Sequence, residues 1–170
     1  SLRSFRRNRN DPRPWREERW GLYSRRLPVP TSLNVLEVRS HNCKGVITLD
    51  AGFVFTLVDI FFGGDGKGRR LEGNSEFTPM ETRLVRKFVT AVTQDMRDAW
   101  KPFVAMDFQL GASEINPIFA AVAAGSDAMC ITGFDLTLSG QEFRFEIVLP
   151  DGETVAEKAG GQMARELLLN

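Results

Sequence analysis

Residues 50–66 read Asp-Ala-Gly-Phe-Val-Phe-Thr-Leu-Val-Asp-Ile-Phe-Phe-Gly-Gly-Asp-Gly, a mostly apolar segment whose last four residues include three glycines. Its apolar side chains recur at the three- and four-residue spacing of one helix face, and Asp50 stands where a helix N-cap is expected. The apolar positions are Phe53, Val54, Leu57, Val58 and Phe61. We therefore predict a short buried helix that ends in a glycine-rich loop.

The loop consists of Gly63, Gly64, Asp65 and Gly66. Glycine adopts positive φ without steric cost, so the loop could simply cap the helix and turn the chain. Three glycines in four residues would also let another molecule approach the backbone closely. The spacing alone leaves both interpretations open, a helix cap and a contact loop.

Two enzymatic interpretations of this loop are weaker. A phosphate-binding glycine loop follows a strand and opens a helix, whereas this loop follows a predicted helix. Nucleotide cyclases also carry a Gly-Gly-Asp triplet, but Asp65 has no second acid beside it to hold a divalent metal. We therefore predict no catalytic residue, no metal site and no cofactor here.

Composition indicates one soluble globular domain. The chain has 170 residues, of which 42% are hydrophobic and 26% charged, values that are ordinary for such a protein. No apolar run approaches the length that crosses a bilayer, and the arginine-rich N-terminus lacks the apolar core of a signal peptide. We expect a cytoplasmic protein.

The few thiol and imidazole groups do not suggest a reactive site. Cys43 and Cys130 lie far apart in the sequence without a second thiol nearby, so neither a zinc site nor a disulfide framework is indicated. His41, the only histidine, falls in a predicted turn and is a weak candidate for catalysis.

Charge is divided unevenly along the chain. Residues 1–26 hold nine arginines and three acids, which gives +6, while the other 13 basic and 19 acidic residues give −6. The favoured interpretation is a tail whose arginines are solvated or fold against the acidic body. The alternative is a nucleic-acid-binding arm in which Trp15 and Trp20 are interleaved with arginines.

The folded domain is predicted to begin at Leu27, because Leu27-Pro-Val-Pro-Thr31 favours an extended backbone. Two β-rich runs follow, 33–38 and 45–49, joined by a turn over 39–44. These runs lead into the helix of residues 50–66.

A long second helix is predicted from the capping box at Thr78 and Pro79, and Pro102 stops it. Apolar residues hold one face for six turns, and the opposite face should be solvated. The apolar face comprises Leu84, Val85, Phe88, Val89, Val92, Met96, Ala99 and Trp100, and the polar face Arg83, Arg86, Lys87, Gln94, Arg97 and Asp98.

The remaining pattern is mainly β. Residues 106–110 form a candidate strand, and residues 113–117 interrupt the chain before the apolar segment 118–124. Residues 128–138 and 141–149 should form a hairpin about Ser139-Gly140. Alternating apolar and polar residues in the second arm indicate one buried face. The predicted fold is α+β, with helices packed on an antiparallel sheet. A helix over 156–168 is also considered, although Gly160-Gly161 weakens it.

Five motifs in this order resemble the middle domain of the bacterial flagellar motor switch protein FliM. They are Leu27-Pro-Val-Pro-Thr31, the 54–66 segment, Glu76-Phe-Thr-Pro79 opening the long helix, Ser113-Glu-Ile-Asn-Pro117 and the strand 142–150. The resemblance covers about residues 27–150. It implies the pseudo-symmetric fold of the CheC chemotaxis phosphatases, incomplete in its N-terminal half because residues 1–26 match neither expected element. The implied division is an Arg-rich segment 1–26, a FliM middle-like domain 27–150 and a tail 151–170.

The resemblance implies a structural rotor part. The family assembles into the cytoplasmic ring at the base of the flagellum, peripheral to the inner membrane, and takes part in torque generation and control of rotation direction. Its Gly-Gly-X-Gly loop contacts FliG, so the implied FliG-binding residues are Gly63, Gly64, Asp65 and Gly66. The implied partners are the FliG middle domain, neighbouring FliM-like subunits and FliN. Neither a small-molecule substrate nor nucleic acid is expected.

The alternative function is a CheC-like phosphatase acting on a phosphorylated response regulator. Such enzymes present a Glu and, three residues later, an Asn on one helix face. Glu114 and Asn116 come closest in this sequence, but they are two residues apart and precede a proline. We therefore predict that the protein is not an enzyme.

Overall fold

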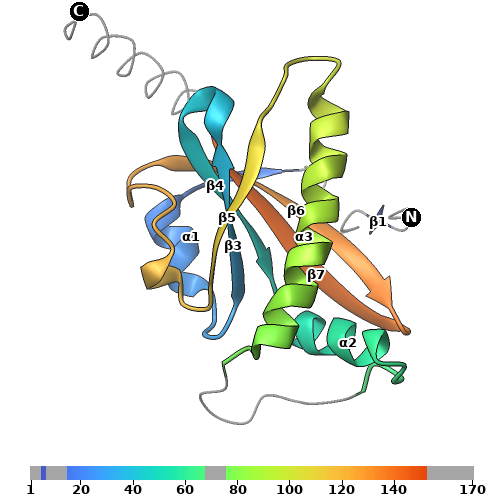
Figure 1. The fold of residues 1–170 in the computed structure, drawn as a ribbon. Helices are drawn as coiled ribbons and strands as arrows, with labels where there is room; N and C mark the ends of the chain where they lie inside the picture. The colour runs from blue at the N-terminus through green and yellow to red at the C-terminus, as the bar shows by residue number, and fades with distance from the viewer. Residues whose placement is uncertain (1–4, 7–14, 68–75, 153–170) are drawn as a thin grey trace, which may run out of the picture.

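The structure is a computed structural model that describes residues 5–6, 15–67 and 76–152. These residues form a seven-stranded antiparallel sheet with helices packed on it (Figure 1). Its strands run in the order β1-β6-β7-β4-β3-β5, and β2 also pairs with β6. The elements are β1 (Phe5–Arg6), β2 (Arg16–Arg19), α1 (Trp20–Arg26), β3 (Ser32–Val38), η1 (Arg39–His41), β4 (Cys43–Leu49), α2 (Ala51–Phe61), α3 (Pro79–Trp100), β5 (Phe108–Glu114), η2 (Pro117–Phe119), β6 (Ala128–Leu138) and β7 (Gln141–Pro150). The predicted α+β class is confirmed.

Alternation along the central strands divides the core into two layers. Ile47 of β4 and Ile147 of β7 face α2 and α3, whereas their neighbours Val46 and Val148 face α1. Successive side chains of a strand point to opposite faces, so a sheet with helices on both sides buries both sets. The sheet is therefore the middle layer of the described fold.

The predicted hairpins are confirmed. β3 pairs with β4 from Ser32↔Leu49 to Val38↔Cys43, and β6 pairs with β7 up to Leu138↔Gln141. Ser139 and Gly140 make the second turn with φ of 50° and 73°. Pairing of β4 with β7 joins the two hairpins into one sheet.

The position of β5 differs from the prediction. The strand covers Phe108–Glu114 rather than 106–110, so it begins two residues later and includes Ser113 and Glu114, the first two residues of the predicted interruption. Its ladder with β3 extends to Leu33↔Glu114 and contains a register shift between Asn34 and Leu36. The extent of β5 therefore depends on its pairing with β3, and the order of polar and apolar residues along β5 does not reveal this pairing.

Residues before Leu27 also belong to the sheet and its core. β2 pairs with β6 over Arg16↔Ile131 to Arg19↔Ala128, and α1 buries Trp20 and Tyr23. The Arg16 guanidinium donates to the Glu146 carboxylate at 2.9 Å. This part of the arginine-rich segment therefore folds against the body of the domain, with Arg16 paired to Glu146 and Trp20 buried. The division at residues 27 and 150 itself stays a prediction.

Helix α3 begins with the predicted capping box. The Thr78 hydroxyl accepts from the Glu81 amide at 3.2 Å, and the Glu81 carboxylate accepts from the Thr78 amide at 2.7 Å. Leu84, Val85, Val89, Val92 and Met96 are buried as expected, whereas Trp100 is exposed.

The polar face of α3 is not wholly solvated, which corrects the prediction. Arg86 donates to the Gly111 carbonyl at 2.9 Å and to the Ser113 hydroxyl at 3.1 Å. Arg97 donates to the Phe108 carbonyl. Both arginines therefore hydrogen-bond α3 to β5. The periodicity of a helix shows which residues share a face, but it does not show that a strand lies beside that face.

No helix in the described part of the chain is long and apolar enough to span a membrane. The helix considered over 156–168 lies outside the described residues.

Candidate functional site

The candidate site lies at the C-terminal end of α2. Contacts at the N-terminal end of the helix fix the orientation of α2. The Asp50 carboxylate accepts from the Phe53 amide at 3.2 Å, which confirms the predicted N-cap. Phe53 is buried, with its ring 5.3 Å from that of Phe88 on α3 and 5.4 Å from that of Phe143 on β7. These aromatic contacts anchor the first half of α2 between α3 and the sheet.

The second half of α2 is not buried, contrary to the prediction. Leu57 and Val58 are half-buried, while Phe61 and Phe62 are 60% and 64% exposed. The two exposed rings pack on each other with centroids 5.6 Å apart. The apolar periodicity correctly predicted the helix. How much of its apolar face is buried depends on how far α3 and β7, which are distant in the sequence, extend along it.

The loop caps α2. The amides of Phe62, Gly63 and Gly64 donate to the carbonyls of Val58, Ile60 and Asp59 at 3.1, 2.9 and 2.9 Å. Gly63 has φ of +83°, the left-handed conformation typical of a helix C-cap, and its Cα faces open space. The capping interpretation is therefore confirmed.

A hydrogen-bond network also fixes the shape of the loop beyond the cap. The Asp59 carboxylate accepts from the Gly66 amide at 2.8 Å. The Gly66 carbonyl accepts from the Thr56 hydroxyl at 3.3 Å and from the Gln141 amide at 3.1 Å. The loop is thereby tied both to α2 and to the β6–β7 hairpin.

Gly64 and Gly66 are needed at their positions for different steric reasons. A Cβ on Gly64 would overlap the Asp59 carboxylate, so only glycine lets this carboxylate reach the Gly66 amide. Gly66 has φ of +81°, and a Cβ there would lie 3.2 Å from both Ser139 and Thr56.

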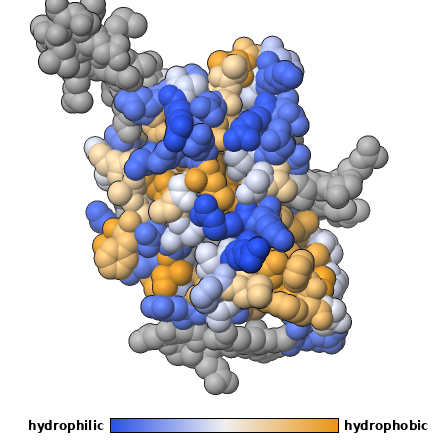
Figure 2. Space-filling view, in the orientation of Figure 1, coloured by the Kyte–Doolittle hydropathy of each residue, from blue (hydrophilic) through white to orange (hydrophobic). Residues whose placement is uncertain are grey.

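The four predicted residues differ in what they present. Gly63, Gly64 and Asp65 are exposed, whereas Gly66 is buried and anchors the loop. The Asp65 carboxylate accepts from the Lys67 amide at 2.9 Å, so its side chain is also fixed. Figure 2 shows hydrophobic surface gathered over α2. Phe61 and Phe62, at the end of this helix, are both exposed. The result is a preorganised loop with accessible backbone beside two aromatic rings.

Sequence reasoning missed the residues that hold the loop: Thr56, Asp59 and Gln141. A signal for Asp59 existed, because it is an acid inside an otherwise apolar helix, seven residues before the glycine that it binds. No pattern pointed to Gln141, which approaches through the tertiary fold.

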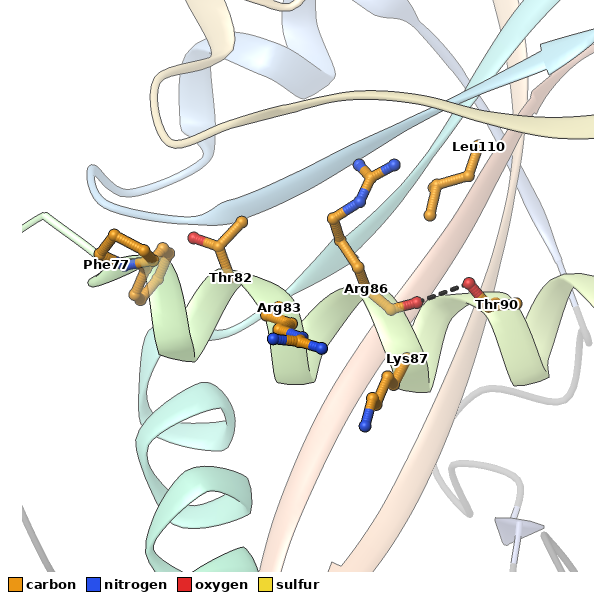
Figure 3. A pocket seen from close by; sticks show the side chains of 8 residues that line it. Phe77, Thr82, Arg83, Arg86, Lys87, Thr90 and Leu110 are labelled. Carbon is orange, nitrogen blue, oxygen red and sulfur yellow. Dashed lines mark hydrogen bonds between the residues drawn. The ribbon is translucent and has the colours of Figure 1, made fainter.

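A shallow pocket of about 810 Å³ flanks the first half of α3 (Figure 3). It is lined by Phe77, Pro79, Thr82, Arg83, Arg86, Lys87, Thr90 and Leu110. Arg86 points toward Leu110, while Arg83 and Lys87 point away from it, and Thr90 donates to the Arg86 carbonyl at 2.7 Å. Because the three cations diverge, the pocket does not focus positive charge on one ligand.

The remaining candidate chemical groups are dispersed. Glu114 ends β5, and the Asn116 side chain accepts from the Ile118 amide at 3.1 Å, so the two do not share a helix face. Cys43 is buried and Cys130 is half-buried, and neither forms a disulfide. Among the residues that the structure describes, no group of three His, Cys, Asp or Glu side chains could hold a metal ion.

Comparison with known proteins relates this fold to flagellar proteins. The family model "Flagellar motor switch protein FliM" matches residues 15–158. FliM of Pseudomonas aeruginosa is 37% identical over 132 residues, which cover 78% of this chain and 41% of that protein. FliM of Escherichia coli is 30% identical over 130 residues, or 75% and 39% of the two chains. The chain thus spans about two fifths of the length of these relatives.

Two solved structures are similar in fold. The FliM middle domain of Vibrio alginolyticus superposes with a TM-score of 0.69 at 32% identity, over 80% of this chain and 75% of that one. A FliG–FliM complex from H. pylori gives a TM-score of 0.73 at 23% identity, over 83% and 78% of the two chains. The second likeness concerns the fold alone.

Proposed function

Because the chain belongs to the family of the flagellar motor switch protein FliM, we propose that it is a structural component of the flagellar motor switch that binds FliG. In this role it takes part in torque generation and in control of rotation direction. The observation that carries the proposal is the preorganised, exposed loop at the end of α2. A FliG–FliM complex is known for a protein of the same fold.

The proposed contact consists of Gly63, Gly64 and Asp65, with Gly66 as the buried anchor. Two exposed glycines let a partner approach the backbone closely. Phe61 and Phe62 add large apolar side chains that a partner could desolvate, and aromatic residues of this kind often dominate binding energy. Because Asp59 already orders the loop, binding requires little further loss of conformational entropy.

The chain acts in this proposal without catalysis, a cofactor, a small-molecule substrate or nucleic acid. The CheC-like phosphatase alternative is not favoured, because Glu114 lies on a strand and the Asn116 side chain caps the short helix η2, so no helix face presents both groups. The proposed location is the cytoplasmic face of the inner membrane, at the flagellar basal body. Neighbouring FliM-like subunits and FliN are the further partners proposed for this location.

Binding to the FliG middle domain tests the proposal directly. We expect saturable binding to the native chain in a calorimetric titration, and at least about tenfold weaker binding to Phe62→Ser, since the loss of one buried aromatic anchor commonly exceeds 1.4 kcal/mol. Phe119→Ser is the matched control, because Phe119 is 68% exposed but lies in η2 rather than beside the loop.

Both variants should keep the native melting temperature, since each replaced ring is mostly in solvent. A folded native chain that shows no binding would contradict the proposal. Equal affinities for the native chain and Phe62→Ser would remove the aromatic pair from the contact.

A further inference from the structure

The Gly66 carbonyl receives hydrogen bonds from two separate elements. The Thr56 hydroxyl on α2 donates to it at 3.3 Å, and the Gln141 side-chain amide at the start of β7 donates to it at 3.1 Å. A carbonyl oxygen has two lone pairs, so both bonds can form at once. Because Gly66 is the buried end of the contact loop, residues 63–66, these two bonds influence where the loop lies relative to the rest of the fold.

Gln141 points at the contact loop because of the turn that precedes it. Ser139 and Gly140 have φ of 50° and 73°, and two successive positive φ values are typical of the type I′ turn of a two-residue hairpin. This turn fixes the pairing of β6 with β7, and the register of a hairpin fixes the face of each side chain. Gln141 and Phe143 consequently share one face of β7, and the Phe143 ring lies 5.4 Å from that of Phe53 at the start of α2.

The end of the β6–β7 hairpin projects beyond β4 toward α2. β4 pairs with β7 from Phe145 to Val148, whereas β6 pairs with it as far as Gln141. Figure 1 shows the turn of the hairpin beside the loop end of α2, and a Cβ on Gly66 would lie 3.2 Å from the Cβ of Ser139. The hairpin is therefore the part of the sheet that reaches the contact loop.

The hydrogen bonds of Gly66 differ in what they join. Its bonds to Asp59 and Thr56 join the contact loop to α2, so they move together with this helix. The bond from Gln141 instead joins the loop to the sheet. The second half of α2 is the less buried half, and segments with few buried contacts open most readily. A bond from the sheet thus limits motion at the end of the helix where its own packing is weakest.

We propose that Gln141 is a positioning residue for the contact loop, which holds the exposed Gly63, Gly64 and Asp65 in one place against the sheet when the partner binds. The inference rests on the proposed function for the identity of that partner, the FliG middle domain. Gln141 acts through Gly66 rather than by touching the partner. A loop that samples other positions presents the binding-competent one for a smaller fraction of the time, so the apparent Kd rises in proportion.

Three variants separate the donated hydrogen bond from other properties of the side chain. Gln141→Met has a similar length but no N–H group, whereas Gln141→Lys keeps a donor at the end of a flexible chain. Glu142→Gln is the matched control, because Glu142 is exposed and lies on the opposite face of β7. A role of the donor predicts that Gln141→Met alone is defective.

Hydrogen exchange of the Gly66 amide in the free chain is the first measurement, because this amide reports opening of the contact loop without FliG. We expect about fivefold faster exchange in Gln141→Met, the effect of losing one typical hydrogen bond. Exchange in Gln141→Lys and Glu142→Gln should stay near the native rate. Unchanged exchange in Gln141→Met, or equal acceleration in Gln141→Lys, would overturn the inference whether or not the chain binds FliG.

Calorimetric titration with the FliG middle domain is the second measurement. We expect Gln141→Met to bind about fivefold more weakly than the native chain, and Gln141→Lys to bind within about twofold of it. Equal affinities of the native chain and Gln141→Met would show that the loop is placed without Gln141. A native chain that fails to bind, with faster Gly66 exchange in Gln141→Met, would instead contradict the proposed function while supporting the placement of the loop by Gln141.

Discussion

The carboxylate of Asp59 accepts the amide hydrogen of Gly66 at 2.8 Å and thereby closes the loop that follows α2. The same carboxylate occupies the space that a side chain at position 64 would need. A single acid inside the helix therefore explains both the order of the loop and one of its glycines.

Replacing Asp59 should destabilise the protein without disturbing the core. Asp59→Ala removes a charged acceptor from the partly buried Gly66 amide, and we expect a loss of about 1–2 kcal/mol in the free energy of unfolding. Chemical denaturation measures this loss. Asp65→Ala is the matched control and should cost less, because its carboxylate bonds the amide of an exposed residue, Lys67. Equal losses would show that Asp59 does not organise the loop.

Gly64 and Gly63 should respond differently to alanine. Gly64→Ala places a Cβ against the Asp59 carboxylate, whereas Gly63→Ala meets no atom and suffers only from its positive φ. That backbone strain costs about 1 kcal/mol. In an Asp59→Ala background the cost of Gly64→Ala should fall, while the cost of Gly63→Ala should not. A double-mutant cycle with denaturation detects this coupling. Additive effects at position 64 would contradict the structural explanation.

Tyr23 should make the stability of the protein sensitive to alkaline pH. Its hydroxyl bonds to Thr48 at 2.9 Å and to Glu146 at 3.1 Å. Burial raises the pKa of the Tyr23 phenol well above its ordinary value, and the Glu146 charge raises it further. Because the folded pKa is raised, the folded state binds the proton more tightly, and this contribution to stability is complete below the unfolded pKa of about 10 and falls as the pH rises above it.

The chain contains one tyrosine, so ultraviolet absorbance of the phenolate reports on Tyr23 alone. We expect phenolate to form together with the loss of the circular-dichroism signal, not before it. The Tyr23→Phe variant should lose stability less steeply above pH 10. Reversible ionisation of the phenol in the folded protein would show that Tyr23 is not held in this way.

Arg86 and Arg83 form a matched pair on α3. Arg86→Ala removes two hydrogen bonds to β5, and we expect a loss of about 1–2 kcal/mol in the free energy of unfolding. Arg83→Ala changes an exposed residue and should stay within about 0.5 kcal/mol of the native value. Thermal and chemical unfolding distinguish these outcomes. Similar values for both variants would mean that the helical periodicity was right to place both residues in solvent.

The sequence by itself determined the local structure. The N-cap at Asp50, the capping box of Thr78 and Glu81, and the turn at Ser139-Gly140 each depend on residues at most three positions apart. Such interactions leave a pattern that can be recognised in the sequence, and the ordered motifs indicated the family before the fold was known. The four loop residues were also found in this way, although their contact with FliG stays a proposal.

The tertiary structure alone decided which predicted surfaces are buried and what holds the site. Phe61 lies beyond the layer that covers Phe53, Arg86 reaches β5, and Gln141 reaches the Gly66 carbonyl from 75 residues away. Arg16 likewise meets Glu146 only because β2 adds to the edge of β6. Periodicity reports which residues share a face of one element. The atoms that this face meets depend on how distant strands pair and where the sheet ends.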